Sequence, residues 1–293
     1  MLEFREISKA FLKTDFILKD ITCRLNTGLH LLVGPNGSGK STFLRMAAGI
    51  MKPGHGIVLY QNQDIYVHPV WYKYRLGYLP QNFAFYSHMT GKEYLFYLAN
   101  LKGIFGKEAQ YRVSYTAELL GIEKLCSEKI STWSVGMRQC LGIAQSLLND
   151  PDVLILDEPL CSLAFEESSS IRELLCRLAY RKVIVMSSHL TDDLPVSHLL
   201  MLVNGTLCFN GTADTFIRQT ENQVWTGTTG KDCWMNIRQD YPDSTVIFTE
   251  RTCSFRIISS SRPALPDIKS ALPSLEEAYL IHMRKLDQNG TGT

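Results

Sequence analysis

The first thirty residues show the alternation of hydrophobic and polar positions that is typical of strands. Two such patches, Leu2–Ile7 and Phe16–Leu25, are followed by the turn residues Asn26, Thr27 and Gly28. Alternation with period two predicts half-buried strands, and we expect antiparallel pairing here. The next run, Leu29–Val33, is apolar except for His30 and is bounded by glycines. It predicts a fully buried strand.

Strand and helix patterns then alternate along the chain. The expected elements are a helix over 41–50, a strand over 75–79, helices over 90–104, 107–120 and 135–148, a strand over 153–156, a helix over 165–180 and a strand over 182–187. Thr90 with Glu93 forms a capping box at the start of one helix. Strands that alternate with helices predict a parallel sheet, and the stretch from about 85 to 135 predicts a helical insert in it. Asn204-Gly205 predicts a hairpin between two short strands.

The composition changes beyond Thr220, where turns rich in Gly, Thr and Ser separate short β runs. Three prolines then precede a helix expected over 275–285, with Ser274 and Glu277 as its capping box. We therefore predict two domains, 1–220 and 221–293, the second a small α+β accessory domain. Its role in dimerisation, in regulation or in packing alone is left open by the sequence.

Composition excludes several classes of function. The 293 residues carry 30 basic and 29 acidic side chains, a net charge of +1, so no strong field predicts a nucleic-acid partner. No stretch approaches the roughly 18 apolar residues of a membrane span, and no signal peptide is recognisable at the start of the sequence. The eight cysteines form no C-x-x-C pair and predict reduced thiols in the cytosol.

A glycine-rich loop between the strand at 29–33 and the following helix carries the strongest chemical signal. Its nine residues fit G-x-x-x-x-G-K-[ST]: Gly34, Pro35, Asn36, Gly37, Ser38, Gly39, Lys40, Ser41 and Thr42. Glycines let the backbone N–H groups of such a loop face phosphate oxygens, at the positive end of a helix. Lys40 is expected to reach the β- and γ-phosphates of ATP, and Ser41 to bind Mg²⁺.

Two carboxylates follow the apolar run Val153–Leu156. Asp157 is expected at the carboxyl edge of the sheet, where it would bind Mg²⁺. Glu158 is expected to polarise the attacking water as a general base. A strand that ends in acids is by itself more often a capped sheet edge, but downstream of a phosphate loop the catalytic interpretation is favoured.

With these motifs in this order, residues 1 to about 220 resemble an ABC-type ATPase. The resemblance implies an α/β P-loop NTPase fold: a parallel sheet with an N-terminal antiparallel β subdomain and a helical insert. It also implies site residues. Gln81 matches the glutamine that contacts Mg²⁺ or the water and couples to the membrane subunit, His189 matches the histidine at the γ-phosphate, and Phe11 occupies the place of the aromatic that stacks on adenine.

The signature segment, residues 132–139, resembles that of the family but departs from its pattern. Ser134 and Gly136 match it and are expected to bind the γ-phosphate of ATP held by an opposite subunit. Val135 replaces a glycine, and a β-branched side chain adds bulk where phosphate should approach. Ala164 stands where an aspartate helps to join the two sites. We therefore expect a slowed ATPase, or one that pairs with a more typical subunit.

The resemblance implies an ATPase subunit of a transporter, peripheral on the inner face of the cell membrane through a separate permease, and paired with a second ATPase subunit. The sequence around Pro273–Tyr279 favours export. The alternative is a nucleotide-gated regulatory subunit with weak turnover. Aromatic residues of the insert, Tyr94, Phe96, Tyr97 and Phe105, are expected either to receive the permease or to form core.

Overall fold

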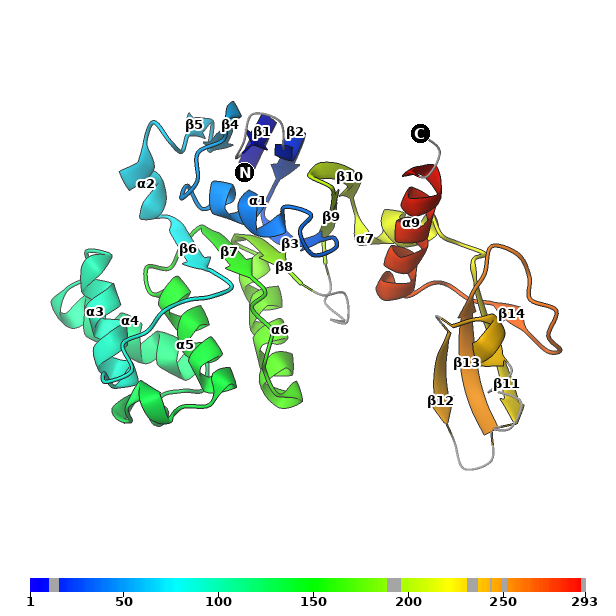
Figure 1. Cartoon of the computed structure of the whole chain (residues 1–293). Helices are drawn as coiled ribbons and strands as arrows, with labels where there is room; N and C mark the ends of the chain where they lie inside the picture. Colours follow the sequence, from blue (N-terminus) through cyan, green and yellow to red (C-terminus); the bar gives the residue numbers. More distant parts are fainter. Residues whose placement is uncertain (11–15, 189–195, 231–236, 243, 249–251, 291–293) are drawn as a thin grey trace. The chain divides into compact units, whose positions relative to one another are not determined.

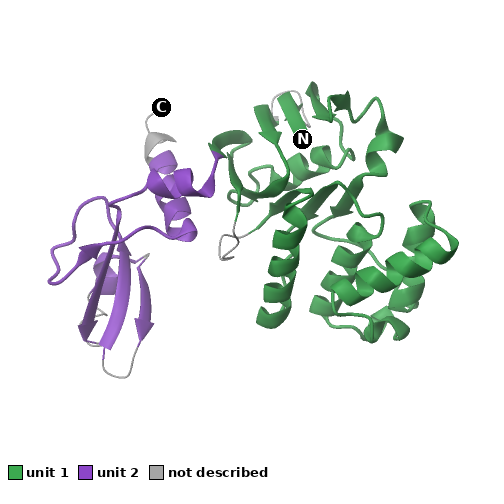
Figure 2. Cartoon of the chain, turned by 180° about the vertical axis from the view of Figure 1, so that it is seen from behind, with its two compact units in different colours: residues 1–210 green, residues 211–293 purple. Residues whose placement is uncertain are grey.

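The computed structural model describes residues 1–10, 16–188, 196–230, 237–242, 244–248 and 252–290. The chain divides into two compact units, residues 1–210 and 211–293 (Figure 2). In the described residues, no helix combines the length and the apolar character needed to cross a bilayer. The seven cysteines in this part of the chain are free thiols.

A four-stranded antiparallel sheet begins the first unit. Its spatial order is β2-β1-β4-β5. The strands are β1 Leu2–Ala10, β2 Phe16–Leu25, β4 His55–Tyr60 and β5 Gln63–Asp64. The expected antiparallel pairing of the first two strands is confirmed, with Leu2 opposite Leu25. The turn at 26–28 then leads out of this sheet into the next one, because Gly28 pairs with Val183 in a parallel ladder.

A six-stranded sheet, in the order β10-β9-β3-β8-β7-β6, forms the centre of this unit. Its strands are β3 Gly28–Val33, β6 Leu76–Leu79, β7 Val153–Asp157, β8 Val183–Ser187, β9 His198–Val203 and β10 Thr206–Gly211. All five residues of both β7 and β8 are buried, as expected for parallel strands covered on both faces. The parallel core predicted from the sequence is therefore confirmed.

Helices cover both faces of this sheet. Figure 1 shows α1, Lys40–Ala47, between the two sheets, and α5 and α6 on the other side of the six-stranded sheet. These two helices span Val135–Leu147 and Phe165–Ala179. The core on the α1 side includes Phe4, Phe43 and Ile155. The carboxyl ends of β3 and β7 thus lie beside the start of α1.

The segments between β5 and α5 include the predicted helical insert. Besides β6, they are α2 Pro69–Lys73, α3 Gly91–Leu101, α4 Gly106–Leu119 and the 3-10 turns Leu125–Ser127 and Ile130–Thr132. The capping box is present, since Thr90 Oγ1 accepts from the Glu93 N–H and the Glu93 carboxylate accepts from the Thr90 N–H. The aromatic residues divide between the two expectations: Tyr94 is buried, whereas Tyr97 and Phe105 are exposed.

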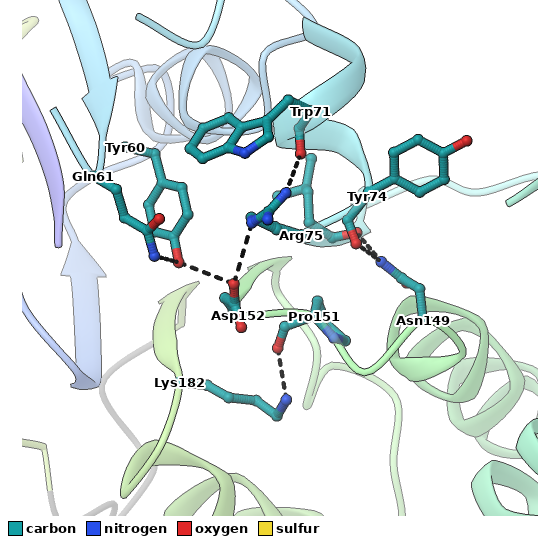
Figure 3. Close-up of polar contacts among 10 residues, drawn as sticks. Tyr60, Gln61, Trp71, Tyr74, Arg75, Asn149, Pro151, Asp152 and Lys182 are labelled. Atoms are coloured by element: carbon teal, nitrogen blue, oxygen red, sulfur yellow. Dashed lines mark hydrogen bonds and ion pairs between the residues drawn. The ribbon is translucent and has the colours of Figure 1, made fainter. Parts of the chain in front are cut away.

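Polar contacts join the amino ends of the central strands (Figure 3). Tyr60 Oη donates to Asp152 at 3.2 Å, and the Arg75 guanidinium lies 3.7 Å from the same carboxylate. Asn149 donates to the carbonyl of Tyr74, and Lys182 donates to the carbonyl of Pro151. These contacts connect the antiparallel sheet, α2, β7 and β8 at the amino ends of the strands, opposite the carboxyl end of β7 that carries Asp157.

The second unit combines helices with a four-stranded sheet in the order β12-β13-β11-β14. Its elements are α7 Ala213–Arg218, β11 Val224–Gly230, β12 Thr245–Phe248, β13 Thr252–Ile258, β14 Lys269–Ser270 and α9 Leu275–Gly290, and residues 237–240 are also helical. The capping box of α9 is present. Glu277 also binds Arg256 through two oxygens at 2.7 and 2.8 Å, so α9 is tied to β13.

Candidate functional site

The loop between β3 and α1 has the backbone expected of a phosphate-binding turn. Gly37 and Gly39 have φ of 78° and 103°, in the left-handed region that glycine adopts without strain. The Ser38 N–H donates to Pro35 O, and the first helical bond runs from Phe43 N–H to Gly39 O. The N–H groups that open α1 are therefore directed at the loop, where an anion would lie.

The ammonium of Lys40 lies inside this loop. Its Nζ donates to the carbonyls of Gly34 at 2.8 Å and Pro35 at 3.1 Å. Burial lowers the pKa of Lys40, and the nearby charges of Glu158 and Asp157 oppose that shift. The amine therefore sits close enough to both carboxylates for their charges to act on it. An anion in the loop would stabilise the charged amine further.

The hairpin of β9 and β10 supports the loop from behind. The Gly205 N–H donates to Ser38 O at 3.1 Å, and Gly205 O accepts from the Lys19 N–H at 2.8 Å. Asn204 and Gly205 have φ of 49° and 76°, the signs required by the predicted two-residue turn. A Cβ at Gly34 would lie 2.0 Å from Leu202 O, so the loop also needs glycine there for its approach to β9.

Asp157 and Glu158 meet at the buried hydroxyl of Ser187. The parallel register of β7 and β8 places Asp157 opposite Ser187. Ser187 Oγ donates to Asp157 Oδ1 at 2.7 Å and accepts from the Glu158 N–H at 2.8 Å. Asp157 is buried at the carboxyl edge of the sheet, as the sequence analysis expects, while Glu158 is half-buried.

Glu158 is held in a left-handed backbone conformation, with φ of 53°. For a residue with a side chain such a conformation costs of order 1 kcal/mol or more and needs support from its surroundings. Gln139 Nε2 donates to the carbonyl of Pro159 at 3.0 Å and lies 3.4 Å from that of Glu158. Gln81 Nε2 donates to Glu158 Oε2 at 3.0 Å. The structure thus brings Gln81 to Glu158, 77 residues away in the sequence.

A cavity of about 460 Å³ opens beside these groups. It is lined by Gln81, Asn82, Phe83, Phe85, Val135, Arg138, Gln139, Glu158, Cys161 and Ser162. The Phe83 ring packs closely against α5, because a Cβ added at Gly142 of that helix would lie 2.5 Å from the ring. The loop that carries Gln81 therefore rests directly on the helix that begins at the signature segment.

The signature residues lie at the start of α5. Ser134 is the N-cap and accepts from the Met137 N–H at 3.1 Å, which confirms that this segment opens a helix. Gly136 is buried, and a Cβ there would lie 2.6 Å from Glu167 Oε2. Val135 is 56% exposed and faces the cavity. Ala164, the other departure from the family pattern, is the N-cap of α6 and is exposed.

Two predicted site residues, Phe11 and His189, lie outside the described residues. Their places at the adenine and at the γ-phosphate therefore stay predictions. Ser41 and Thr42 are half-buried in the first turn of α1, directly after Lys40.

Known proteins match the part of the chain that carries this geometry. A family model described as ABC transporter matches residues 18–161. The molybdate/tungstate import ATP-binding protein WtpC of Methanocaldococcus jannaschii is 30% identical over 212 residues, which cover 71% of this chain and 69% of that protein. The chain belongs to the ABC transporter ATP-binding family.

Two further matches agree with this assignment. The uncharacterized ABC transporter ATP-binding protein YxlF of Bacillus subtilis is 29% identical over 229 residues, which cover 77% of this chain and 76% of that protein. A solved structure of an ATP-binding subunit of an ABC transporter has a TM-score of 0.68 at 26% identity, covering 75% of this chain and 92% of that one. The chain is therefore an ATP-binding subunit of an ABC transporter.

The residues present fit the groups that this family binds. Ser38 Oγ is buried and has no hydrogen-bond partner in the described part of the chain, so a phosphate oxygen would satisfy it. Lys40 and the first N–H groups of α1 would supply further donors to ATP. Asp157 and Ser41 would hold Mg²⁺, which proteins usually bind through one or two side chains together with phosphates and water.

Sequence reasoning did not single out three residues that shape this site: Ser187, Gln139 and Gly205. Gln139 lies at the end of the signature segment and Gly205 in the predicted hairpin turn, but neither position by itself indicates a contact with the site. Ser187 ends an apolar strand, and its contact with Asp157 depends on the β7–β8 register. That register is a long-range property, which explains why no local pattern revealed it.

Proposed function

We propose that this ABC transporter subunit hydrolyses ATP and thereby powers a separate membrane permease. The observation that supports hydrolysis best is the hydrogen bond of 3.0 Å between the Gln81 amide and the Glu158 carboxylate. A carboxylate held in place beside the phosphate loop can act as the general base that activates a water molecule. A subunit that only binds nucleotide has no such need for Glu158.

Each residue has a distinct role in this proposal. Lys40, with the α1 N–H groups, binds the β- and γ-phosphates, and Glu158 takes a proton from water while Gln81 holds its carboxylate. Asp157 and Ser41 bind Mg²⁺, which would neutralise charge on the phosphates. The roles predicted from the family for Phe11, at the adenine, and for His189, at the γ-phosphate, complete the proposal.

The test is ATP turnover of the purified chain and of its Glu158→Gln variant. We expect the variant to bind ATP with unchanged affinity and to lose about 100-fold or more in turnover, the scale typical of a lost general base. Glu108→Gln, on an exposed position of α4, is the matched control and should keep wild-type turnover. Equal turnover of wild type and Glu158→Gln would refute hydrolysis at this site.

We propose further that ATP is held between two subunits and that turnover is slow when this chain pairs with itself. Ser134 and Gly136 would face the γ-phosphate of the partner's ATP, and Val135 adds exposed bulk beside them. Ala164 removes a carboxylate from the neighbouring helix start. These two departures also favour the alternative of a nucleotide-gated regulatory subunit, or of a heterodimer with a more typical second ATPase.

We propose that the permease binds in an apolar groove of about 430 Å³ in the first unit. Its lining includes Ile50, Val70, Tyr74, Leu76, Leu101 and Lys102. Four of these apolar side chains are largely exposed, which is typical of an interaction surface. Its ionisable lining residues are Lys73, Lys102 and two tyrosines, so we infer a permease segment that is apolar and carries a carboxylate.

Binding through this groove would place the chain on the inner face of the cell membrane. Co-expression with a permease encoded beside this chain tests the proposal, with Leu101→Ser expected to abolish co-purification and Leu272→Ser, an exposed leucine of the second unit, expected to preserve it. Retention of the permease by Leu101→Ser would refute the groove. The prediction of export rests on the sequence near Pro273 alone, and the relatives include an importer by name.

A further inference from the structure

The hydroxyl of Ser187 connects the two acids of the site in a defined direction. Ser187 is fully buried at the end of β8. Its Oγ lies 2.7 Å from Asp157 Oδ1 and 2.8 Å from the backbone nitrogen of Glu158. A backbone N–H can only donate, so Oγ accepts from Glu158 and its single proton goes to Asp157.

Each of these two hydrogen bonds has a consequence for the chemistry. The bond to Asp157 uses one carboxylate oxygen and leaves the other for a metal ion. The bond from Glu158 helps to hold that residue at its positive φ of 53°, a conformation that persists only when neighbouring groups fix it. A single buried side chain therefore sets both the orientation of one acid and the backbone of the next.

We propose that Ser187 is a positioning residue that aligns the Mg²⁺ carboxylate of Asp157 with the general base Glu158. This inference rests on the proposed function of the site. Ser187 does not touch ATP or water in the proposal and acts through the two acids alone. Loss of the hydroxyl should therefore weaken metal binding and turnover together, while ATP binding without metal stays unchanged.

The experiment compares Ser187→Thr with Ser187→Val, because these variants have the same shape and differ in the hydroxyl. Any steric disturbance at this fully buried position is common to both. Both side chains are also well suited to a strand. Ser146→Ala is a matched control, since Ser146 is fully buried too and its hydroxyl donates at 2.7 Å within its own helix, to Ile143 O.

Three readouts are needed for each variant of the full chain: ATP turnover, Mn²⁺ affinity measured by electron paramagnetic resonance with a non-hydrolysable ATP analogue, and analogue affinity without metal. We expect Ser187→Val to bind Mn²⁺ about tenfold more weakly than Ser187→Thr and to turn over about 10- to 100-fold more slowly, the scale of a lost hydrogen bond to a charged group. The affinity for the ATP analogue in the absence of metal should agree within about twofold among all variants.

Equal Mn²⁺ affinity and turnover in the Thr and Val variants would overturn the positioning role. A weaker metal-free affinity in Ser187→Val alone would overturn it as well, because the effect would then lie in the nucleotide pocket. The outcome is separable from the proposed function. If Glu158→Gln loses turnover while Ser187→Val does not, only the inference about Ser187 fails. If Glu158→Gln retains turnover, the proposed hydrolysis fails first.

Discussion

Gly205 offers a quantitative test of how the phosphate loop is supported. It occupies the second position of the β9–β10 turn and donates to Ser38 O at 3.1 Å. Its φ is 76°, and a Cβ there would lie 2.4 Å from Ile17 O, a backbone atom. Gly205→Ala therefore perturbs the loop from outside the nucleotide pocket, without changing any group that we expect to touch ATP.

The expected loss of folding free energy in Gly205→Ala has two parts. Alanine in the left-handed region costs about 1–2 kcal/mol relative to glycine. The clash with Ile17 O adds about 1–3 kcal/mol, as overpacking typically does. Gly121→Ala is the matched control, since Gly121 has φ of 66° and an added Cβ would meet nothing within 4 Å in the described part of the chain. Gly121→Ala therefore loses stability only through the left-handed backbone conformation. The difference in the free energy of unfolding between the two variants measures the cost of the clash with Ile17 O.

The assay combines urea unfolding with ATP affinity measured by a fluorescent analogue. We expect Gly205→Ala to lose about 1–3 kcal/mol more stability than Gly121→Ala. A shift of the turn that relieves the clash would disturb the hydrogen bond from Gly205 to Ser38 O, so we also expect about tenfold weaker ATP binding, equivalent to about 1.4 kcal/mol. Gly121→Ala should bind ATP as the wild type does. Equal ATP affinities of the two variants would refute the support of the loop by this hairpin.

Three further predictions follow from particular contacts. Val135→Gly should raise ATP turnover about fivefold, equivalent to about 1 kcal/mol of relieved crowding; a fast wild type that the change leaves unaffected contradicts the slowed-ATPase proposal. Burial lowers the pKa of Lys102 to about 8, below its ordinary 10.5, so urea unfolding at pH 8 and pH 10 should show stability rising with pH in the wild type relative to Lys102→Met. Burial raises the pKa of Glu277, but hydrogen bonds from Arg256 and Ser274 outweigh it and lower the pKa below 4.5. Stability measured by circular dichroism should therefore be lost as pH falls below about 4.5, and Glu277→Gln should lack that loss and cost about 1 kcal/mol at neutral pH.

Local sequence patterns predicted the central elements of the fold because those elements are buried on both faces. The runs at 29–33, 153–156 and 182–187 are mainly apolar, with His30, Lys182 and Ser187 as exceptions, and each contributes a strand to the parallel sheet. The region from 55 to 73 was not predicted, although it holds β4, β5 and α2. The strand β5 has only two residues and α2 only five, and elements this short give no detectable period.

The site divides in a similar way between local and long-range information. The phosphate loop and the two acids are contiguous motifs, and their chemistry follows from neighbouring residues in the sequence. The contacts of Ser187 with Asp157 and of Gln81 with Glu158 join residues 30 and 77 positions apart. Such pairs depend on strand register and on loop packing, neither of which a hydrophobic pattern specifies.

The groove proposed for the permease and the site around Glu158 are connected through β6 and the loop that follows it. Leu76 and Tyr78 of β6 line the groove proposed for the permease, and Gln81, two residues beyond the strand, binds Glu158. Gln145 of α5 donates to Tyr78 O at 2.9 Å, so the strand is also fixed to the helix of the signature segment. A permease segment that shifts β6 would thus move the amide that orients the proposed base. Coupling between transport and hydrolysis would then need no contact between the permease and ATP, because displacement of one short strand changes the geometry at Glu158.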